Sequence, residues 1–265
     1  TDNVSNSGTS TVSLGESISL ADSVSETRDT TIPLSETLQV SDGESSSASL
    51  SILALDAETD GVNGFTELQG AEGVDTFTIG SKTYAIVGSY NDQGIQIIDV
   101  SDPADIVAVD AETDGVNGFT ELKKVLGVDT FTIGASTYAI AAARDDNGVQ
   151  VIDVSDPTNI VAVDAETDNA NGFTELRGAR GVDTFVIGAS TYAIVASRDD
   201  NGVQVIDVSD PTNIVAVDAE TDNANGFTEL QGAGGVDTFV IGSSTYAIVT
   251  SRLDHGIQII DVSDP

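Results

Sequence analysis

The sequence contains no Cys, Met or Trp and only one His among its 265 residues. Without cysteine it can form no disulfide, no thiolate metal site and no cysteine nucleophile. A single His cannot provide a three-His zinc site, although one His can still serve in a catalytic triad. No G-x-S-x-G nucleophile motif accompanies His255, so the usual serine hydrolase arrangement is not indicated.

Basic residues and long apolar runs are also scarce. Nine Lys and Arg stand against 44 Asp and Glu, which gives a formal net charge of -35. Such a charge repels nucleic acid and anionic membranes, so we expect neither nucleic-acid binding nor membrane insertion. Polar residues interrupt every apolar run well short of the roughly 18 residues that suggest a membrane span. A hydrophobic content of 39% is nevertheless sufficient for a core, and the acidity favours an extracellular or cell-surface location.

Aromatic residues are missing from the first part of the chain. All eight Phe and all five Tyr lie after residue 48, so residues 1–48 are a poor candidate for an independent core. This Ser/Thr-rich N-terminal arm still has two segments, 12–22 and 32–42, in which apolar residues alternate with polar ones. Alternation is typical of a half-buried β-strand, which needs a sheet to join. The arm is therefore either a flexible stalk or a pair of donor strands.

Residues 49–265 consist of a fourfold repeat. The motif FTEL begins at Phe65, Phe119, Phe173 and Phe227, at a spacing of 54 residues, and DVSDP recurs at the same spacing. Each repeat has four runs rich in Val, Ile, Thr and aromatic residues, which favour strands. Asn-Gly at 147–148 and 201–202 lies between two such runs, as in a β-hairpin.

Four strands per repeat predict an all-β fold, a β-propeller built from four 54-residue four-stranded repeats, preceded by the strand-like arm. A β-solenoid is the structural alternative. The fourth repeat ends before its last strand, but a matching run, LSILALD, stands at 50–56. If that run pairs with the fourth repeat of the same chain, the ring closes. If it pairs with the next molecule, the result is an open polymer.

The segment GVQVIDVSDP, followed by an IVAV run, resembles the LVIVD-repeat family. The resemblance covers residues 49–265 and all four DVSDP motifs. That family is associated with β-propellers in archaeal and bacterial cell-surface proteins, which implies a surface location and no defined catalysis. The Ser/Thr-rich arm is similar to segments of archaeal surface proteins.

The connection between repeats carries the clearest chemical pattern. Residues 56–67, DAETDGVNGFTE, are close to the calcium loop of an EF-hand, whose carboxylates stand at positions 1, 3, 5 and 12. Calcium prefers such clustered oxygen ligands, so the sequence predicts Ca2+ binding, and an acidic solvated loop is the alternative. The predicted metal ligands are Asp56, Glu58, Asp60 and Glu67, then Asp110, Glu112, Asp114 and Glu121, then Asp164, Glu166, Asp168 and Glu175, and finally Asp218, Glu220, Asp222 and Glu229.

These observations together predict a function. We expect a non-enzymatic, calcium-stabilised structural protein of the cell exterior, which assembles into a filament or surface layer. The arm would make it a homo-oligomer by β-strand addition. The alternative is a monomeric propeller that binds a glycan or protein ligand on the cell surface. A propeller enzyme is disfavoured, because no repeat departs from the others to create a unique catalytic site.

Overall fold

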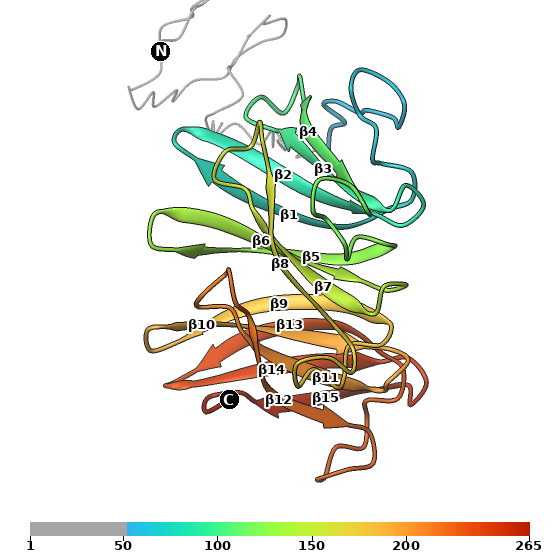
Figure 1. The fold of residues 1–265 in the computed structure, drawn as a ribbon, viewed down its shortest axis with the longest axis vertical. Coiled ribbons are helices and arrows are strands. Elements are labelled where there is room, and N and C mark those ends of the chain that lie inside the picture. Colours follow the sequence, from blue (N-terminus) through green and yellow to red (C-terminus); the bar gives the residue numbers. More distant parts are fainter. Residues whose placement is uncertain (1–51) are drawn as a thin grey trace, which may run out of the picture. The chain divides into compact units, whose positions relative to one another are not determined.

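The computed structural model describes residues 52–265, so the N-terminal arm and its predicted strands lie outside the described residues. The described part contains fifteen β-strands in four antiparallel sheets and no helix (Figure 1). Accordingly, no helix within residues 52–265 is long and apolar enough to cross a membrane.

Each sheet follows the chain, so that consecutive strands are neighbours. The first sheet contains β1 (Ala71–Ile79), β2 (Lys82–Ser89), β3 (Gly94–Asp99) and β4 (Val107–Thr113). The second contains β5 (Val125–Ile133), β6 (Ser136–Ala143), β7 (Gly148–Asp153) and β8 (Val161–Thr167). The third contains β9 (Ala179–Ile187), β10 (Ser190–Ser197), β11 (Gly202–Asp207) and β12 (Val215–Thr221). The fourth contains only β13 (Ala233–Ile241), β14 (Ser244–Ser251) and β15 (Gly256–Asp261).

Turn chemistry explains where the strands reverse. Ile79 pairs with Lys82 across the turn between β1 and β2, and Gly80 in that turn has a φ of 64°. In the next type of hairpin, between β6 and β7, Asn147 takes a φ of 60° directly before Gly148. Asn and Gly are the residues that adopt this left-handed conformation most readily. The predicted Asn-Gly hairpin is thus confirmed.

The core lies between the sheets. Buried residues form one cluster shared by the first and second sheets, one shared by the second and third, and one shared by the third and fourth. The first strand of each sheet, here called the inner strand, makes most of the contacts between sheets. Strand β1 packs on β5, β5 on β9 and β9 on β13. Gly181 shows how closely they approach: a Cβ there would lie 2.5 Å from the carbonyl oxygen of Gly234 in the next sheet. No such packing joins β13 back to β1 within the described part.

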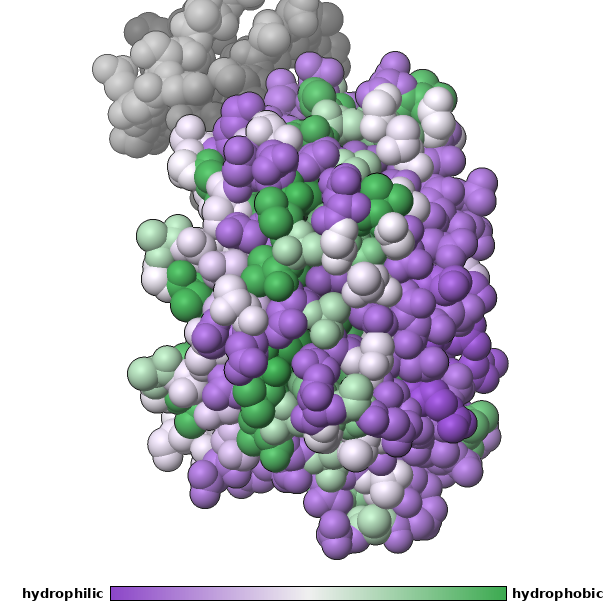
Figure 2. Space-filling view, in the orientation of Figure 1, coloured by the Kyte–Doolittle hydropathy of each residue, from purple (hydrophilic) through white to green (hydrophobic). Residues whose placement is uncertain are grey.

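The all-β, propeller-like fold of four 54-residue repeats is confirmed. Three repeats have four strands, and the fourth sheet ends at β15, as expected for a repeat that stops before its last strand. Residues 52–56 of the LSILALD run form no strand with β15 in the same chain. In Figure 2, hydrophilic residues dominate one side of the described part, and hydrophobic residues form separate patches on the face toward the viewer.

Candidate functional site in the acidic connections

The predicted calcium loop begins inside a strand. In the second copy, Asp110 and Glu112 belong to β4, and only Asp114 and Glu121 follow its end. The same holds for the third and fourth copies, whose first two carboxylates lie in β8 and β12. The expectation of a loop between strands is therefore wrong for the first part of the motif, because ladder pairing with the third strand continues as far as Thr113.

The Asp at position 1 joins neighbouring repeats. Asp110 Oδ2 accepts a hydrogen bond at 2.8 Å from the backbone N–H of Ile160, which lies 50 residues further along the chain. Its Oδ1 accepts a second bond, at 2.9 Å, from the N–H of Ala111. Asp56 and Asp164 accept the corresponding bonds from Ile106 and Ile214, both at 2.8 Å. This carboxylate satisfies backbone donors that would otherwise lack partners.

The Glu at position 3 holds an Asn at position 8. Asn117 Nδ2 donates to both carboxylate oxygens of Glu112, at 3.1 and 3.0 Å. Asn117 also has a φ of 51°, which Asn tolerates better than other residues with a Cβ. Glu58, Glu166 and Glu220 accept the same bonds from Asn63, Asn171 and Asn225. The Asn that departs from the EF-hand pattern thus has a local structural role.

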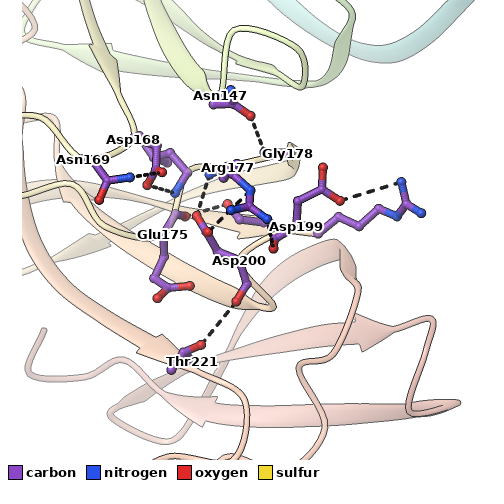
Figure 3. A network of polar contacts seen from close by, with 12 residues as sticks. Asn147, Asp168, Asn169, Glu175, Arg177, Gly178, Asp199, Asp200 and Thr221 are labelled. Atoms are coloured by element: carbon purple, nitrogen blue, oxygen red, sulfur yellow. Dashed lines mark hydrogen bonds and ion pairs between the residues drawn. The ribbon is translucent and has the colours of Figure 1, made fainter.

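The Asp at position 5 lies beside a second Asp that the sequence analysis did not single out. In the third repeat, Asp168 Oδ1 accepts from the N–H of Leu176 at 3.3 Å. Asp200, from the hairpin between β10 and β11, accepts from the next N–H, that of Arg177, at 2.7 Å. Figure 3 shows Asp168, Asp200 and Glu175 near one another, with Arg177 beside Asp200. Burial is the main cause that raises the pKa of Asp200, and the charge of Asp168 adds to it.

Asp200 belongs to a set of four equivalent residues. Its counterparts are Asp92, Asp146 and Asp254. Each accepts a 2.7 Å bond from the backbone N–H two residues after the FTEL glutamate. The signal available in the sequence was an Asp at the same place in every DNG-type hairpin, which was interpreted only as a turn.

The Glu at position 12 is the most buried carboxyl group of the set. Glu121 is 9% exposed, and its Oε2 has no hydrogen-bond partner. Burial, together with the charges of Asp146 and Asp114, raises the pKa of Glu121 to about 8. Burial likewise raises the pKa of Glu175 to about 7, and it also raises the pKa of Glu67. Glu121 and Glu175 therefore hold a proton near neutral pH.

A glycine makes room for each buried Glu. A Cβ at Gly148 would lie 2.5 Å from Glu121 Oε2 and 2.5 Å from the carbonyl oxygen of Glu166. Any residue larger than glycine would therefore displace either the carboxyl group or the fourth strand. The Gly of each DNG-type turn is needed for this reason as well as for the hairpin.

The structure thus divides the predicted ligands. The residues at positions 1, 3 and 5 accept hydrogen bonds from protein donors, and those at position 12 are partly or almost fully buried. Within residues 52–265, no group of three or more His, Cys, Asp or Glu side chains is arranged to hold a metal ion. The charge of Asp114 nevertheless contributes to the raised pKa of both Glu121 and Asp146, so these carboxyl groups lie close together. Calcium binding stays a prediction.

Comparison with known structures adds information on the fold. An exo-β-1,3-galactanase from Phanerochaete chrysosporium, in complex with β-1,3-galactotriose, is similar with a TM-score of 0.52 and 12% identity. The similarity covers 80% of this chain and 51% of the galactanase, so the chain spans about half the length of that enzyme. A second structure of the galactanase, with galactose, has a TM-score of 0.51, the same 12% identity and the same coverage. No curated protein sequence matches the chain.

These neighbours correct one expectation. The sequence analysis predicted that the chain is not an enzyme, but a glycoside hydrolase has the same fold. The prediction was wrong, because this architecture gives no reason to exclude catalysis. At 12% identity the similarity shows the fold alone.

The repeat itself is recognised directly. The LVIVD repeat matches residues 81–110, 138–165 and 189–219. Each matched segment contains most or all of the second strand and the whole third strand of one sheet, and it reaches into the fourth strand as far as the Asp at position 1 of the acidic motif or just beyond it. The chain therefore contains LVIVD repeats in three places and has a β-propeller-like fold.

Proposed function

We propose that this chain is a structural protein of the cell exterior that assembles with its own copies into a filament or surface layer. The observation that supports this most directly is the open edge of the fourth sheet. The strands β3, β7 and β11 each have an outer neighbour, whereas β15 has none in the described part. An unpaired strand edge offers a row of backbone donors and acceptors to an added strand.

A buried glutamine marks the place of the added strand. Gln96 Nε2 donates to the carbonyl oxygen of Asp110 in β4 at 2.8 Å, and Gln150 and Gln204 make the same bond to β8 and β12. Gln258 in β15 is only partly buried, and its Nε2 donates only to Ile259 in its own strand. An added strand would provide the backbone carbonyl acceptor that Gln96, Gln150 and Gln204 have and Gln258 lacks, and it would replace water there.

The N-terminal arm is the donor in this proposal, since residues 12–22 and 32–42 have the alternation of strands that need a sheet. Electron microscopy and sedimentation of the full chain test the proposal. Filaments or layers are expected, and removal of residues 1–48 should abolish them while circular dichroism and melting show that the repeats stay folded. A full chain that remains monomeric at all concentrations would refute the proposal.

A second function, ligand binding, is favoured by one specific observation. The inner strands meet at a cavity of 330 Å³ lined by Glu72, Leu126, Arg180 and Gly234, among others. These four residues occupy the one repeat position at which all four copies differ. A cavity whose lining differs in every repeat is what an asymmetric ligand would need, and a glycan or protein segment on the cell surface would fit the proposal.

The test of this alternative is a glycan array with the full chain. Binding that is lost in Arg180→Gly and Glu72→Gly, which copy the residue of the fourth repeat, would support a site at the cavity. The control is Thr158→Ala, a change in an exposed loop that lines no part of the cavity. Equal binding by all variants would refute the site.

A further inference from the structure

One contact joins every pair of neighbouring sheets. Asp183 Oδ2 in β9 accepts bonds from the backbone N–H and the Oγ1 of Thr238 in β13, at 2.8 and 2.5 Å. Asp129 accepts from the N–H of Thr184 at 2.7 Å, and Asp75 accepts from the hydroxyl of Thr130. Each sheet thus presents an Asp acceptor on one face and a Thr donor on the opposite face.

The first and fourth sheets each have one member of this Asp–Thr pair without its partner in the described part. Asp237, the fourth Asp, is exposed and has no hydrogen-bond partner within residues 52–265. Thr76, the first Thr, is exposed on β1. The fourth sheet therefore offers the acceptor and the first sheet offers the donor.

The apolar surfaces of the two end sheets are also unpaired. Ile257 and Ile259 of β15 are 56% and 47% exposed, whereas Val149 and Val151 at the same positions of β7 are fully buried. On the first sheet, Val74 is 62% exposed, whereas its equivalent Val128 is 7% exposed. Exposed apolar surface that is buried in every internal repeat indicates a docking face.

Residues 55–59 are the candidate for the outer strand that the fourth sheet lacks. Asp56 Oδ2 accepts from the N–H of Ile106 at 2.8 Å, the same bond by which Asp110 in β4 reaches the following repeat. This bond holds Asp56 as though it belonged to the outer strand of a sheet in front of the first one. Leu55 beside it is 62% exposed, while its equivalent Val109 packs against the core.

We propose that two copies join head to tail, with the fourth sheet of one copy packed on the first sheet of the next. Asp237 of one copy accepts hydrogen bonds from Thr76 of the other, as Asp183 does from Thr238. Residues 55–59 of the second copy pair with β15 of the first and complete its sheet, and the N-terminal arm that precedes them adds its strands at the edge beyond. By analogy with β11 and β12, Gln258 lies opposite Ala57 and Ile259 opposite Asp56. This inference rests on the proposed self-assembly and specifies its contact.

The same contact between sheets occurs three times inside each chain. The fourth sheet therefore fits the first sheet of a second copy better than an unrelated partner. These two faces do not pack on each other within one chain, because no packing of β13 on β1 like that of β1 on β5 occurs in the described part, where the four sheets follow one another (Figure 1). A contact between unlike faces is heterologous, so each added copy leaves a new face open.

The first experiment blocks one face at a time in the full chain. Val74→Arg is expected to block the first sheet and Ile257→Arg the fourth, because each places a charge in an apolar contact. Each variant alone should require at least about tenfold higher concentration to associate in sedimentation velocity, as a loss near 1.4 kcal/mol implies. Mixed together, the two variants should form 1:1 dimers and nothing larger. Val161→Arg, at an exposed Val of β8, is the matched control and should assemble like the original chain.

The second experiment uses the absence of cysteine in the chain. A Thr76→Cys copy mixed with an Asp237→Cys copy should form a disulfide-linked dimer under mild oxidation, and neither variant alone should do so. Dimers of Val74→Arg alone would indicate a contact between two fourth sheets and would overturn the proposal. Assembly that is lost without residues 1–48 but unaffected by both arginine variants would overturn only this contact. A wild-type chain that never associates would refute the proposed function as well.

Discussion

The third and fourth repeats are almost identical in sequence but differ in their surroundings. The strands β9 and β13 differ only at one residue, Arg180 against Gly234. Phe185 in β9 is nevertheless 6% exposed and Phe239 in β13 is only half-buried, because a further sheet covers β9 and none covers β13 in the described part.

This difference shows that a repeat encodes two faces of one interface. Each repeat has an acceptor face and a donor face, and an internal repeat satisfies both. In such arrays, stability comes from the contact between repeats as well as from each repeat itself. Substitutions at equivalent positions therefore test directly what the neighbouring sheet contributes.

The largest difference is expected at the glycines of the inner strands. Gly181→Ala places a Cβ 2.5 Å from a backbone oxygen of the next sheet, whereas Gly235→Ala meets only Thr250 Oγ1, at 3.4 Å. Because the backbone of a packed sheet cannot move away freely, Gly181→Ala should lower the free energy of unfolding by about 3 kcal/mol, and Gly235→Ala by less than about 1 kcal/mol. Urea denaturation of dilute protein measures both. Equal losses would contradict the view that β13 has an uncovered face.

The next largest difference is expected at the Asp–Thr contact. Asp183→Ala leaves the N–H of Thr238 without its acceptor, which should lower the free energy of unfolding by about 1–3 kcal/mol. Asp237→Ala removes no such bond from the monomer, so its effect there should be below about 0.5 kcal/mol. Thermal melting of dilute samples measures the two variants side by side. A destabilisation by Asp237→Ala as large as that by Asp183→Ala would mean that Asp237 already has a partner in the monomer.

A smaller effect concerns the buried Glu of the covered repeats. Burial raises the pKa of Glu121 to about 8, above the value of about 4.3 for an unfolded chain. The folded protein then holds a proton that the unfolded chain releases, so this stabilisation is full below about pH 4 and is lost as the pH rises through about 8. Glu175 and Asp129, with pKa values of about 7 and about 6, act in the same direction.

Urea denaturation at pH 5 and pH 8 measures this dependence. The free energy of unfolding is expected to be larger at pH 5, and Glu121→Gln should reduce the difference by about 1–2 kcal/mol. Glu72→Gln, at an exposed residue of β1, is the matched control and should leave the difference unchanged. A protein more stable at pH 8 than at pH 5 would contradict a protonated Glu121.

The strands and hairpins of this fold follow from local sequence. Period-two runs between Gly and Asn-Gly turns gave the strands of each repeat, and the 54-residue spacing gave the number of sheets. The unpaired edge of the fourth sheet could not be predicted from local sequence. Ring closure depends on the angle between sheets, and no single repeat determines that angle. The LSILALD run matches an outer strand in sequence, but pairing also requires β15 to come within reach.

The acidic connection was harder to predict for another reason. The twelve residues from Asp56 to Glu67 match a calcium loop in spacing, but spacing does not show which oxygens already accept backbone hydrogen bonds. The partner of Asp114 is Asp146, which comes from a hairpin 32 residues further along the chain. Contacts between distant segments of this kind become visible only when the strands are placed beside one another.

The smallest expected effect tests the predicted calcium ions. Calcium in tenfold excess over a Kd should add about 1.4 kcal/mol per site, which raises the melting temperature by a few degrees and is reversed by EDTA. If the predicted loops bind the ion, Glu112→Gln should weaken the response of the second repeat, because it removes a ligand at position 3. If Asp146→Asn weakens the response instead, the ion lies beside Asp146 and Glu121, where the charge of Asp146 helps to raise the pKa of Glu121. Asp105→Asn, an exposed residue outside both sets, is the control, and an unchanged melting temperature in calcium and EDTA would refute calcium stabilisation.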